Sequence, residues 1–184
     1  MKKQILVLVI AVFAVTQATA SGFTGYFAPA NWTVSLPESQ FGGSVSHEPN
    51  VLTIHGPDGA MCFGGKEVSV SIAMPDNGVV WFRWDYISYD VDGPTFDVFI
   101  IRKTVTGTEH ILEFIDYNGY GVYSGAFNQG DELSFVVRSE DCVLGEGVVT
   151  ITGFQFIKDP VVPVANWAIY LGVVLMALFL MLRQ

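Results

Sequence analysis

Apolar and polar side chains alternate along most of the chain, and glycine, proline, asparagine and aspartate separate the alternating segments. Val68, Val70 and Ile72 fall on one face of an extended segment, with serines between them on the other. A period of two is typical of a strand with one buried and one exposed face. The pattern predicts strands over residues 51–55, 67–73, 79–86, 96–102, 110–115, 121–126, 132–138 and 148–156, with an additional strand around 32–36.

Eight or nine short strands at this spacing predict an all-β domain, a single antiparallel β-sandwich of jelly-roll type. Aromatic residues make up 14% of the sequence, enough large side chains to fill the space between two sheets. Residues 79–86 are almost continuously large, so we expect a central strand that is covered on both faces. The order in which the strands pair does not follow from the period.

The N-terminal end differs from this pattern. Lys2 and Lys3 precede an apolar stretch over residues 5–15, and the small residues Ala18 and Ala20 follow it. This order predicts a signal peptide over residues 1–20 that is cleaved after Ala20. Export would place the domain in an oxidising environment.

The C-terminal end contains 22 uncharged, mostly apolar residues over 161–182, which is long enough to cross a bilayer. Pro163 suits a helix entrance, Trp167 suits the membrane interface and Arg183 suits the cytoplasmic side. We therefore expect a linker and a transmembrane anchor over residues 159–184. The domain at 21–158 would then be extracytoplasmic, held by a single membrane span.

The chain carries 9 basic and 18 acidic side chains, a net charge of −9. Loss of Lys2 and Lys3 with the signal peptide leaves a net charge of −11. The remaining basic residues are scattered, which argues against nucleic acid as a partner. No nucleophile elbow, zinc-type histidine spacing or phosphate-binding glycine loop occurs in the sequence, so we expect no enzyme activity.

Cys62 and Cys142 are the only cysteines. An even number in an exported chain predicts a disulfide bond, with two free buried thiols as the alternative.

Four aromatic residues could form a stacking platform for a sugar, because aromatic rings beside asparagine and glycine suit adaptable recognition. They are Trp32, Tyr117, Tyr120 and Tyr123. The alternative is that these residues belong to the half-buried edge of the sandwich.

Several segments resemble a recurrent domain of secreted and surface-attached bacterial proteins that is similar to the CUB-type β-sandwich. They are WFRWDY at 81–86, DVDGPTFD at 90–97, SGAF at 124–127, RSED at 138–141 and residues 147–156. The resemblance covers roughly residues 23–156 and implies a non-catalytic extracellular module.

In calcium-binding members of the CUB fold, carboxylates at the positions of Asp97 and Asp141 help to hold the ion. The resemblance therefore implies Ca²⁺ at these two residues, with Asp90 and Asp92 as additional or alternative ligands. The alternative is that the segment around Asp92 is a plain turn and that the other carboxylates are solvated or paired with arginine.

The C-terminal segment resembles the sorting signals that exosortase-type enzymes process in exported bacterial proteins. Pro163, Trp167, the apolar stretch and Arg183 match that plan, although the best-known motif spellings are missing and only one terminal arginine is present. The resemblance implies a sorting protease as a partner.

Two functions follow from these features. The first is a membrane-anchored, cell-surface or extracytoplasmic module for adhesion or structural interaction. The alternative is a carbohydrate-binding module that uses the aromatic turn over residues 117–123.

Overall fold

The computed structural model describes residues 19–159 and four single residues near the C-terminus, Val174, Met176, Leu178 and Met181. Almost all of the expected signal peptide lies outside the described residues, and so do Pro163, Trp167 and Arg183 of the expected anchor. Ala20, the expected cleavage position, lies within the first strand. Among the described residues, no helix is long and apolar enough to cross a membrane.

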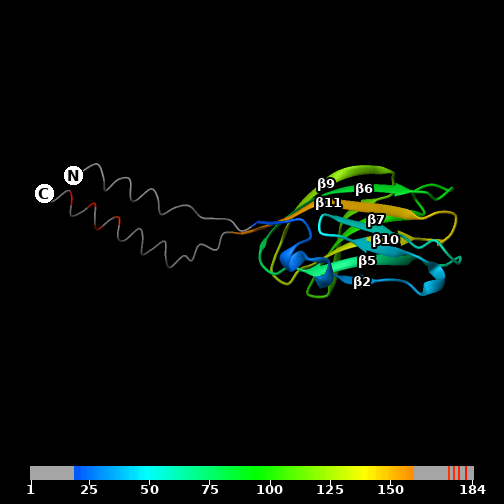
Figure 1. Cartoon of the computed structure of the whole chain (residues 1–184), viewed down its shortest axis with the longest axis horizontal. Helices are drawn as coiled ribbons and strands as arrows, with labels where there is room; N and C mark the ends of the chain where they lie inside the picture. Colours follow the sequence, from blue (N-terminus) through cyan, green and yellow to red (C-terminus); the bar gives the residue numbers. More distant parts are fainter. Residues whose placement is uncertain (1–18, 160–173, 175, 177, 179–180, 182–184) are drawn as a thin grey trace. The chain divides into compact units, whose positions relative to one another are not determined.

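The compact unit that ends at Lys158 consists of two antiparallel sheets, seen as two layers in Figure 1. Sheet A contains β1 (Thr19–Ser21), β3 (Ser44–His47), β4 (Val51–His55), β6 (Gly78–Ser88), β9 (Gly119–Phe127) and β11 (Gly147–Lys158). Sheet B contains β2 (Thr33–Ser35), β5 (Lys66–Ala73), β7 (Asp97–Val105), β8 (Thr108–Ile115) and β10 (Glu132–Ser139). Three short 3₁₀ turns, η2 (Gly25–Phe27), η3 (Pro29–Asn31) and η4 (Ser39–Phe41), lie in the connections.

The strand order is β3-β4-β11-β6-β9 in sheet A, with β1 beside β11, and β2-β5-β10-β7-β8 in sheet B. Consecutive strands therefore often lie in different sheets, as in a jelly roll. The all-β sandwich expected from the sequence is confirmed, and each of the nine expected strands corresponds to an observed one.

The expectation that the strand at 79–86 is covered on both faces is wrong. This strand, β6, does lie between β11 and β9, but only its inner face is buried. Arg83, Asp85 and Ile87 alternate with buried residues and are exposed on the outer face.

The core between the sheets is built largely from aromatic rings. Phe135 of sheet B packs against Phe82 of sheet A with ring centroids 4.9 Å apart, and against Trp32 at 5.7 Å. The indole Nε1–H of Trp32 donates a hydrogen bond to the carbonyl oxygen of Phe27 at 2.9 Å, which satisfies its polar atom inside the core. Burial of each such ring stabilises the fold by about 2–3 kcal/mol.

On the outer face of sheet B, charged side chains pair with one another across a small apolar cluster. Val98, Ile100 and Val136 form a small apolar cluster on this face. The Arg102 guanidinium donates hydrogen bonds to both carboxylate oxygens of Glu67, at 3.0 and 3.1 Å, across the strand that carries Val136. Arg102 also pairs with Glu109 of β8, at 3.2 Å, so this guanidinium joins acidic residues on both sides of it.

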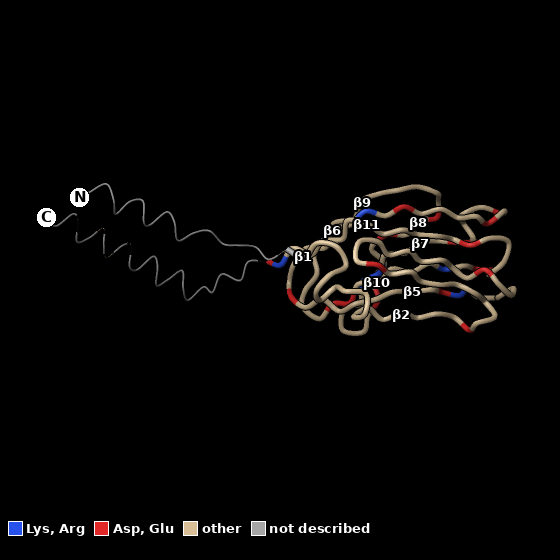
Figure 2. The backbone as a smooth tube through the Cα atoms, in the orientation of Figure 1, with Lys and Arg blue, Asp and Glu red and all other residues tan. Residues whose placement is uncertain are grey.

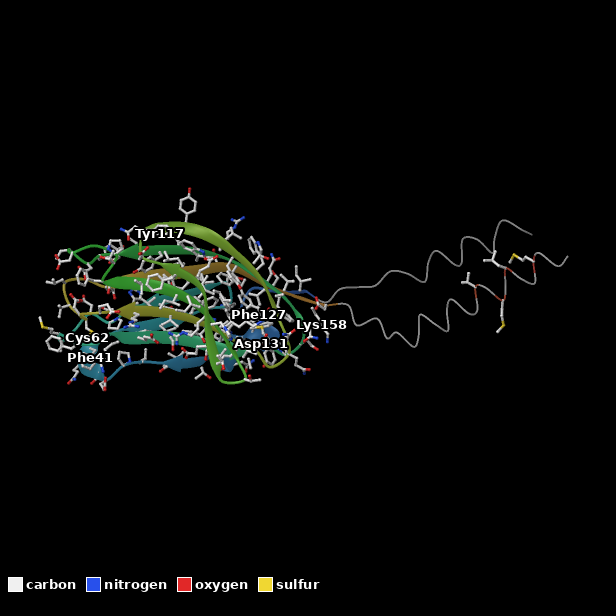
Figure 3. The ribbon with its side chains drawn as sticks, turned by 180° about the vertical axis from the view of Figure 1, so that it is seen from behind. Phe41, Cys62, Tyr117, Phe127, Asp131 and Lys158 are labelled. Carbon is white, nitrogen blue, oxygen red and sulfur yellow. A yellow bond between two sulfur atoms is a disulfide. The ribbon has the colours of Figure 1, made fainter. Side chains whose placement is uncertain are left out.

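At one end of the sandwich, a disulfide joins Cys62 in the β4–β5 connection to Cys142 in the β10–β11 connection, as predicted. Phe41 packs against this disulfide, and Figure 3 shows Phe41 and Cys62 at the end of the sandwich opposite Lys158. We call this end the disulfide tip; it comprises residues 56–65, 88–97 and 139–146. Backbone hydrogen bonds join its segments, because the Val91 N–H donates to the Leu144 carbonyl and the Glu140 N–H to the Phe96 carbonyl.

Candidate functional site

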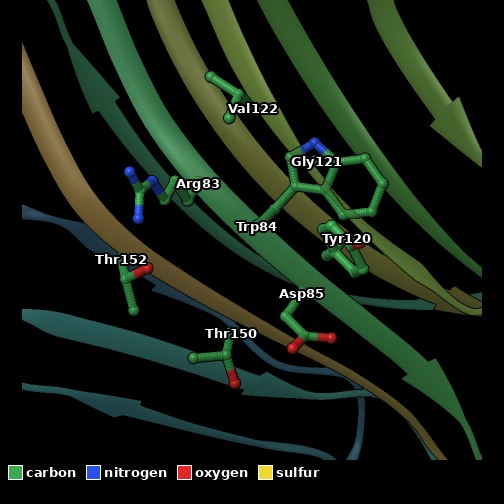
Figure 4. A pocket seen from close by; sticks show the side chains of 8 residues that line it. All are labelled: Arg83, Trp84, Asp85, Tyr120, Gly121, Val122, Thr150 and Thr152. Atoms are coloured by element: carbon green, nitrogen blue, oxygen red, sulfur yellow. The ribbon is translucent and has the colours of Figure 1, made fainter.

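The outer face of sheet A contains a shallow hollow of about 620 Å³ over β11, β6 and β9. Its lining comes from three adjacent strands and is shown in Figure 4: Arg83, Trp84, Asp85, Tyr120, Gly121, Val122, Thr150 and Thr152. The strand register places these side chains in two rows. Thr150, Asp85 and Tyr120 form one row, and Thr152, Arg83 and Val122 form the next.

The charged groups of the hollow form no ion pair in the described part of the chain. Neither Arg83 nor Asp85 forms an ion pair or a side-chain hydrogen bond with another residue of 19–159. Arg102 and Lys103 of sheet B, in contrast, are both paired, with Glu67 and Asp131 respectively. Figure 2 shows acidic residues in both layers and few basic ones. Within residues 19–159, every lysine and arginine except Arg83 forms an ion pair.

A partly exposed aromatic ring, that of Trp81, lies beside the second row of the hollow. The Arg83 guanidinium lies over the Trp81 ring, 5.6 Å from its centroid. Beneath Trp81, β11 departs from regular pairing between Thr152 and Gln155, where Gly153 adopts a φ of +62°. A β-carbon at Gly153 would lie 3.2 Å from the Trp81 ring, so glycine lets the ring approach the bulge closely.

Gly121 of β9 lies between two residues of the hollow, Tyr120 and Val122. A β-carbon at this position would lie 2.5 Å from the indole of Trp84, its cross-strand partner. Trp84 points inward, where its ring packs 6.1 Å from Phe99 of sheet B. The large Trp84 ring therefore requires glycine at position 121. Tyr120 and Val122, the residues before and after Gly121, are exposed.

The structure brings together only part of the aromatic platform expected from the sequence. Tyr120 is 85% exposed and lines the hollow, and Tyr117 is 54% exposed in the preceding turn. Trp32 and Tyr123 are in the core, which corrects their expected role as stacking residues. Side chains alternate between the two faces along β9. Tyr120 faces outward, so Tyr123, three positions later, faces the core and is buried.

The acidic residues expected to bind calcium lie at the disulfide tip. Asp97 is fully buried and Asp90 is 7% exposed, whereas Asp92 is exposed and its backbone N–H donates to Asp90 Oδ1 at 2.6 Å. Burial raises the pKa of Asp97 to about 6 against opposing hydrogen bonds from Ser139 and Ser88, and the charges of Asp90 and Asp141 act in the same direction as burial. Burial also raises the pKa of Asp90.

Within residues 19–159, no three side chains of histidine, cysteine, aspartate or glutamate already form a set that could hold a metal ion. The three histidines lie on β3, β4 and β8.

Sequence reasoning missed Arg83, Asp85, Thr150 and Thr152. A strand rich in large residues was expected to be covered on both faces, which left no exposed surface for its polar members. The available signal was the strict alternation of Arg83 and Asp85 with Phe82, Trp84 and Tyr86, because period-two polarity marks a wet face even in a central strand.

No known protein family and no curated protein matches the sequence. Among solved structures, a mutant of a family 29 carbohydrate-binding module is similar with 15% identity and a TM-score of 0.43, over 77% of this chain and 92% of that one. The family 11 carbohydrate-binding module of a cellulosomal cellulase of Clostridium thermocellum is similar with 10% identity and a TM-score of 0.42, over 79% and 96%.

A family 61 module in complex with β-1,4-galactotriose is similar with 13% identity and a TM-score of 0.41, over 75% of this chain and 94% of that one. At these values, the similarities do not bear on the ligand of this chain.

Proposed function

We propose that this protein is a non-catalytic carbohydrate-binding module and that the hollow on the outer face of sheet A is its glycan-binding surface. One observation carries the proposal: Arg83 and Asp85 are unpaired on an exposed face, beside the ring of Tyr120. The adhesion function is kept as a second candidate.

The chemistry of the hollow suits a sugar. A pyranose presents hydroxyl groups around its rim and an apolar face of C–H groups. Arg83 can donate to hydroxyl oxygens, Asp85 can accept from hydroxyl groups, and Thr150 and Thr152 can do both. Tyr120 supplies an aromatic surface for the apolar face. An open hollow across three strands suits a chain that is bound along its length.

Binding to a glycan array by the purified protein tests the proposal, followed by affinity measurement on the best glycan. We expect Tyr120→Ala and Arg83→Ala each to weaken binding roughly tenfold, or ~1.4 kcal/mol, because each removes one contact surface or one charged donor. Both side chains are exposed, so neither change should unfold the domain.

Phe114→Ala is the matched control, because Phe114 is an aromatic residue of β8 that is 53% exposed on the other sheet. Its affinity for the glycan should equal that of the wild type. Failure of the wild type to retain any glycan, or unchanged binding by both hollow variants, would contradict the proposal.

The adhesion function is favoured by a different surface. The loops of the disulfide tip expose several apolar side chains, and those of Met61, Phe63 and Val91 are 63%, 90% and 76% exposed. Exposed apolar groups on one end of a domain are typical of protein contacts. This candidate predicts that Phe63→Ser abolishes adhesion while glycan binding through the hollow is unchanged.

We also propose that the module works outside the cytoplasm, tethered by the C-terminal segment. The disulfide supports this location, since such bonds persist in oxidising compartments. We propose likewise that a sorting protease recognises the C-terminal segment.

A further inference from the structure

Arg83 differs from the other basic residues of the described chain. Every other lysine and arginine within residues 19–159 is paired with a carboxylate. Arg83 has no such partner, although the whole chain carries 18 acidic residues and only 9 basic ones. Its side chain is exposed on the outer face of sheet A and lines the hollow. An unpaired guanidinium in an acidic protein is available to bind an anion from outside the chain.

Trp81 holds the guanidinium on the side of Arg83 that lies away from Asp85. Residues 81, 83 and 85 project from the same face of β6, because side chains alternate along a strand. The Arg83 guanidinium lies over the Trp81 ring, 5.6 Å from its centroid, and Figure 4 shows it directed away from the Asp85 carboxylate. A ring that covers one face of a guanidinium leaves its N–H edges available to hydrogen-bond acceptors.

The neighbours of Arg83 and Trp81 in the strand register are neutral. They are Thr152, Gln155, Val122 and Ser124. The hydroxyl and amide groups among them can donate hydrogen bonds. Asp85 belongs to the next row, about 7 Å away along the strand. The hollow is therefore polarised, with a positive end at Arg83 and a negative end at Asp85.

The charges of the hollow itself decide what this positive end binds, despite the acidic composition of the whole chain. At physiological ionic strength, interactions between exposed charges are largely screened beyond about 8 Å. An anion at Arg83 is repelled by Asp85 from about 7 Å. A direct contact with the guanidinium is much closer than that, so the attraction outweighs the repulsion.

We propose that the hollow binds an acidic glycan and that Arg83 binds the carboxylate of a uronic acid unit. This inference rests on the proposed glycan-binding function and names the class of glycan. A carboxylate is planar, and the guanidinium fork can donate two parallel hydrogen bonds to it. The Thr152 hydroxyl can donate another. The adjoining neutral part of the chain then lies over Tyr120, where Asp85 accepts hydrogen bonds from hydroxyl groups.

Comparison of uronic acid glycans with their carboxyl-reduced forms tests the inference, because reduction changes only the carboxylate, to a primary alcohol. The probes are oligomers of galacturonate, of mannuronate, and of alternating glucuronate and N-acetylglucosamine. Binding to the purified protein is measured by calorimetry at low and at high salt. We expect at least one acidic probe to bind roughly tenfold more tightly than its reduced form, and this difference to shrink at high salt.

Arg83→Gln assigns the preference to this side chain, because glutamine keeps hydrogen-bonding groups and removes the charge. The variant should bind the acidic and the reduced form with similar affinity. Lys66→Gln is the matched control, because Lys66 belongs to β5 of sheet B and the change removes the same charge. Its preference for the acidic form should equal that of the wild type.

The outcomes separate this inference from the proposed function. Equal binding of the acidic and reduced forms by the wild type, or a preference that persists in Arg83→Gln, would overturn the inference and leave a glycan-binding hollow in place. Binding of neutral glycans alone would do the same. Failure to bind any glycan, acidic or neutral, would overturn both the inference and the proposed function.

Discussion

His47 is the residue whose surroundings give the clearest dependence of stability on pH. Its ring lies edge-on against Phe23 and Trp32, with centroid distances of 4.6 and 5.5 Å. Both ring nitrogens are buried, and neither has a hydrogen-bond partner in the described chain. Burial lowers the pKa of His47 below its usual value near 6.5, because a charged imidazole would lose hydration there.

The unfolded chain therefore binds a proton more readily than the folded one at this position. Stability from neutral His47 should be complete above about pH 6.5 and should fall as the pH drops toward the folded-state pKa, by at most about 1.4 kcal/mol per pH unit. Urea unfolding of the wild type and His47→Leu at pH 7.5 and 5.5 measures this. The variant should gain stability relative to the wild type at the lower pH; an equal difference at both values would refute the assignment.

Site residues could be predicted from the sequence only where they lie close together along the chain. Asp97 was a candidate through the resemblance to calcium-binding CUB-type domains, and Asp90 was an additional candidate in the same acidic segment. Thr150 could not be related to Asp85, because they meet through the pairing of β11 with β6, and pairing order does not follow from a period of two.

At the scale of elements, the disulfide ties the β4–β5 connection to the β10–β11 connection across 80 positions of sequence. In the chain-entropy model, closing a loop of this length stabilises the fold by about 4 kcal/mol. We expect the double variant Cys62→Ala/Cys142→Ala to lose 2–4 kcal/mol of unfolding free energy in urea, with some of the loss coming from packing against Phe41.

Met61→Ala provides the control, because Met61 precedes Cys62 and is 63% exposed. Its unfolding free energy should stay within about 0.5 kcal/mol of the wild type. Intact mass without reductant should be two hydrogens below the reduced value, and recovery of two alkylatable thiols would contradict the bond.

The strands were predictable because each has a sharp alternation between its buried and exposed faces. Two were not. β3 is a four-residue edge strand with three polar members, too short and too polar to stand out from a loop. β1 includes Ala20 within a segment whose small residues predict signal cleavage, so its pairing with β11 had no signal of its own.

At the scale of the whole molecule, the expected anchor makes a prediction about fractionation. A chain ending at Lys158 should be recovered in the soluble fraction, whereas the full chain should stay with membranes after a carbonate wash, because residues 161–182 would be buried in the bilayer. Immunoblots of both fractions measure this. Retention of the shortened chain in the membrane pellet would show that something other than this segment holds it.

β11 is both the last strand before residues 159–184 and a wall of the hollow. It pairs with β6 over ten residue pairs and with β4 over five. Hydrogen bonds in antiparallel sheets run perpendicular to the strands. If a bound glycan and a tether beyond Lys158 are pulled apart along β11, these bonds are loaded in shear and resist together instead of peeling singly. Tension would pass from ligand to tether within sheet A, leaving sheet B and the disulfide tip outside the path of the force.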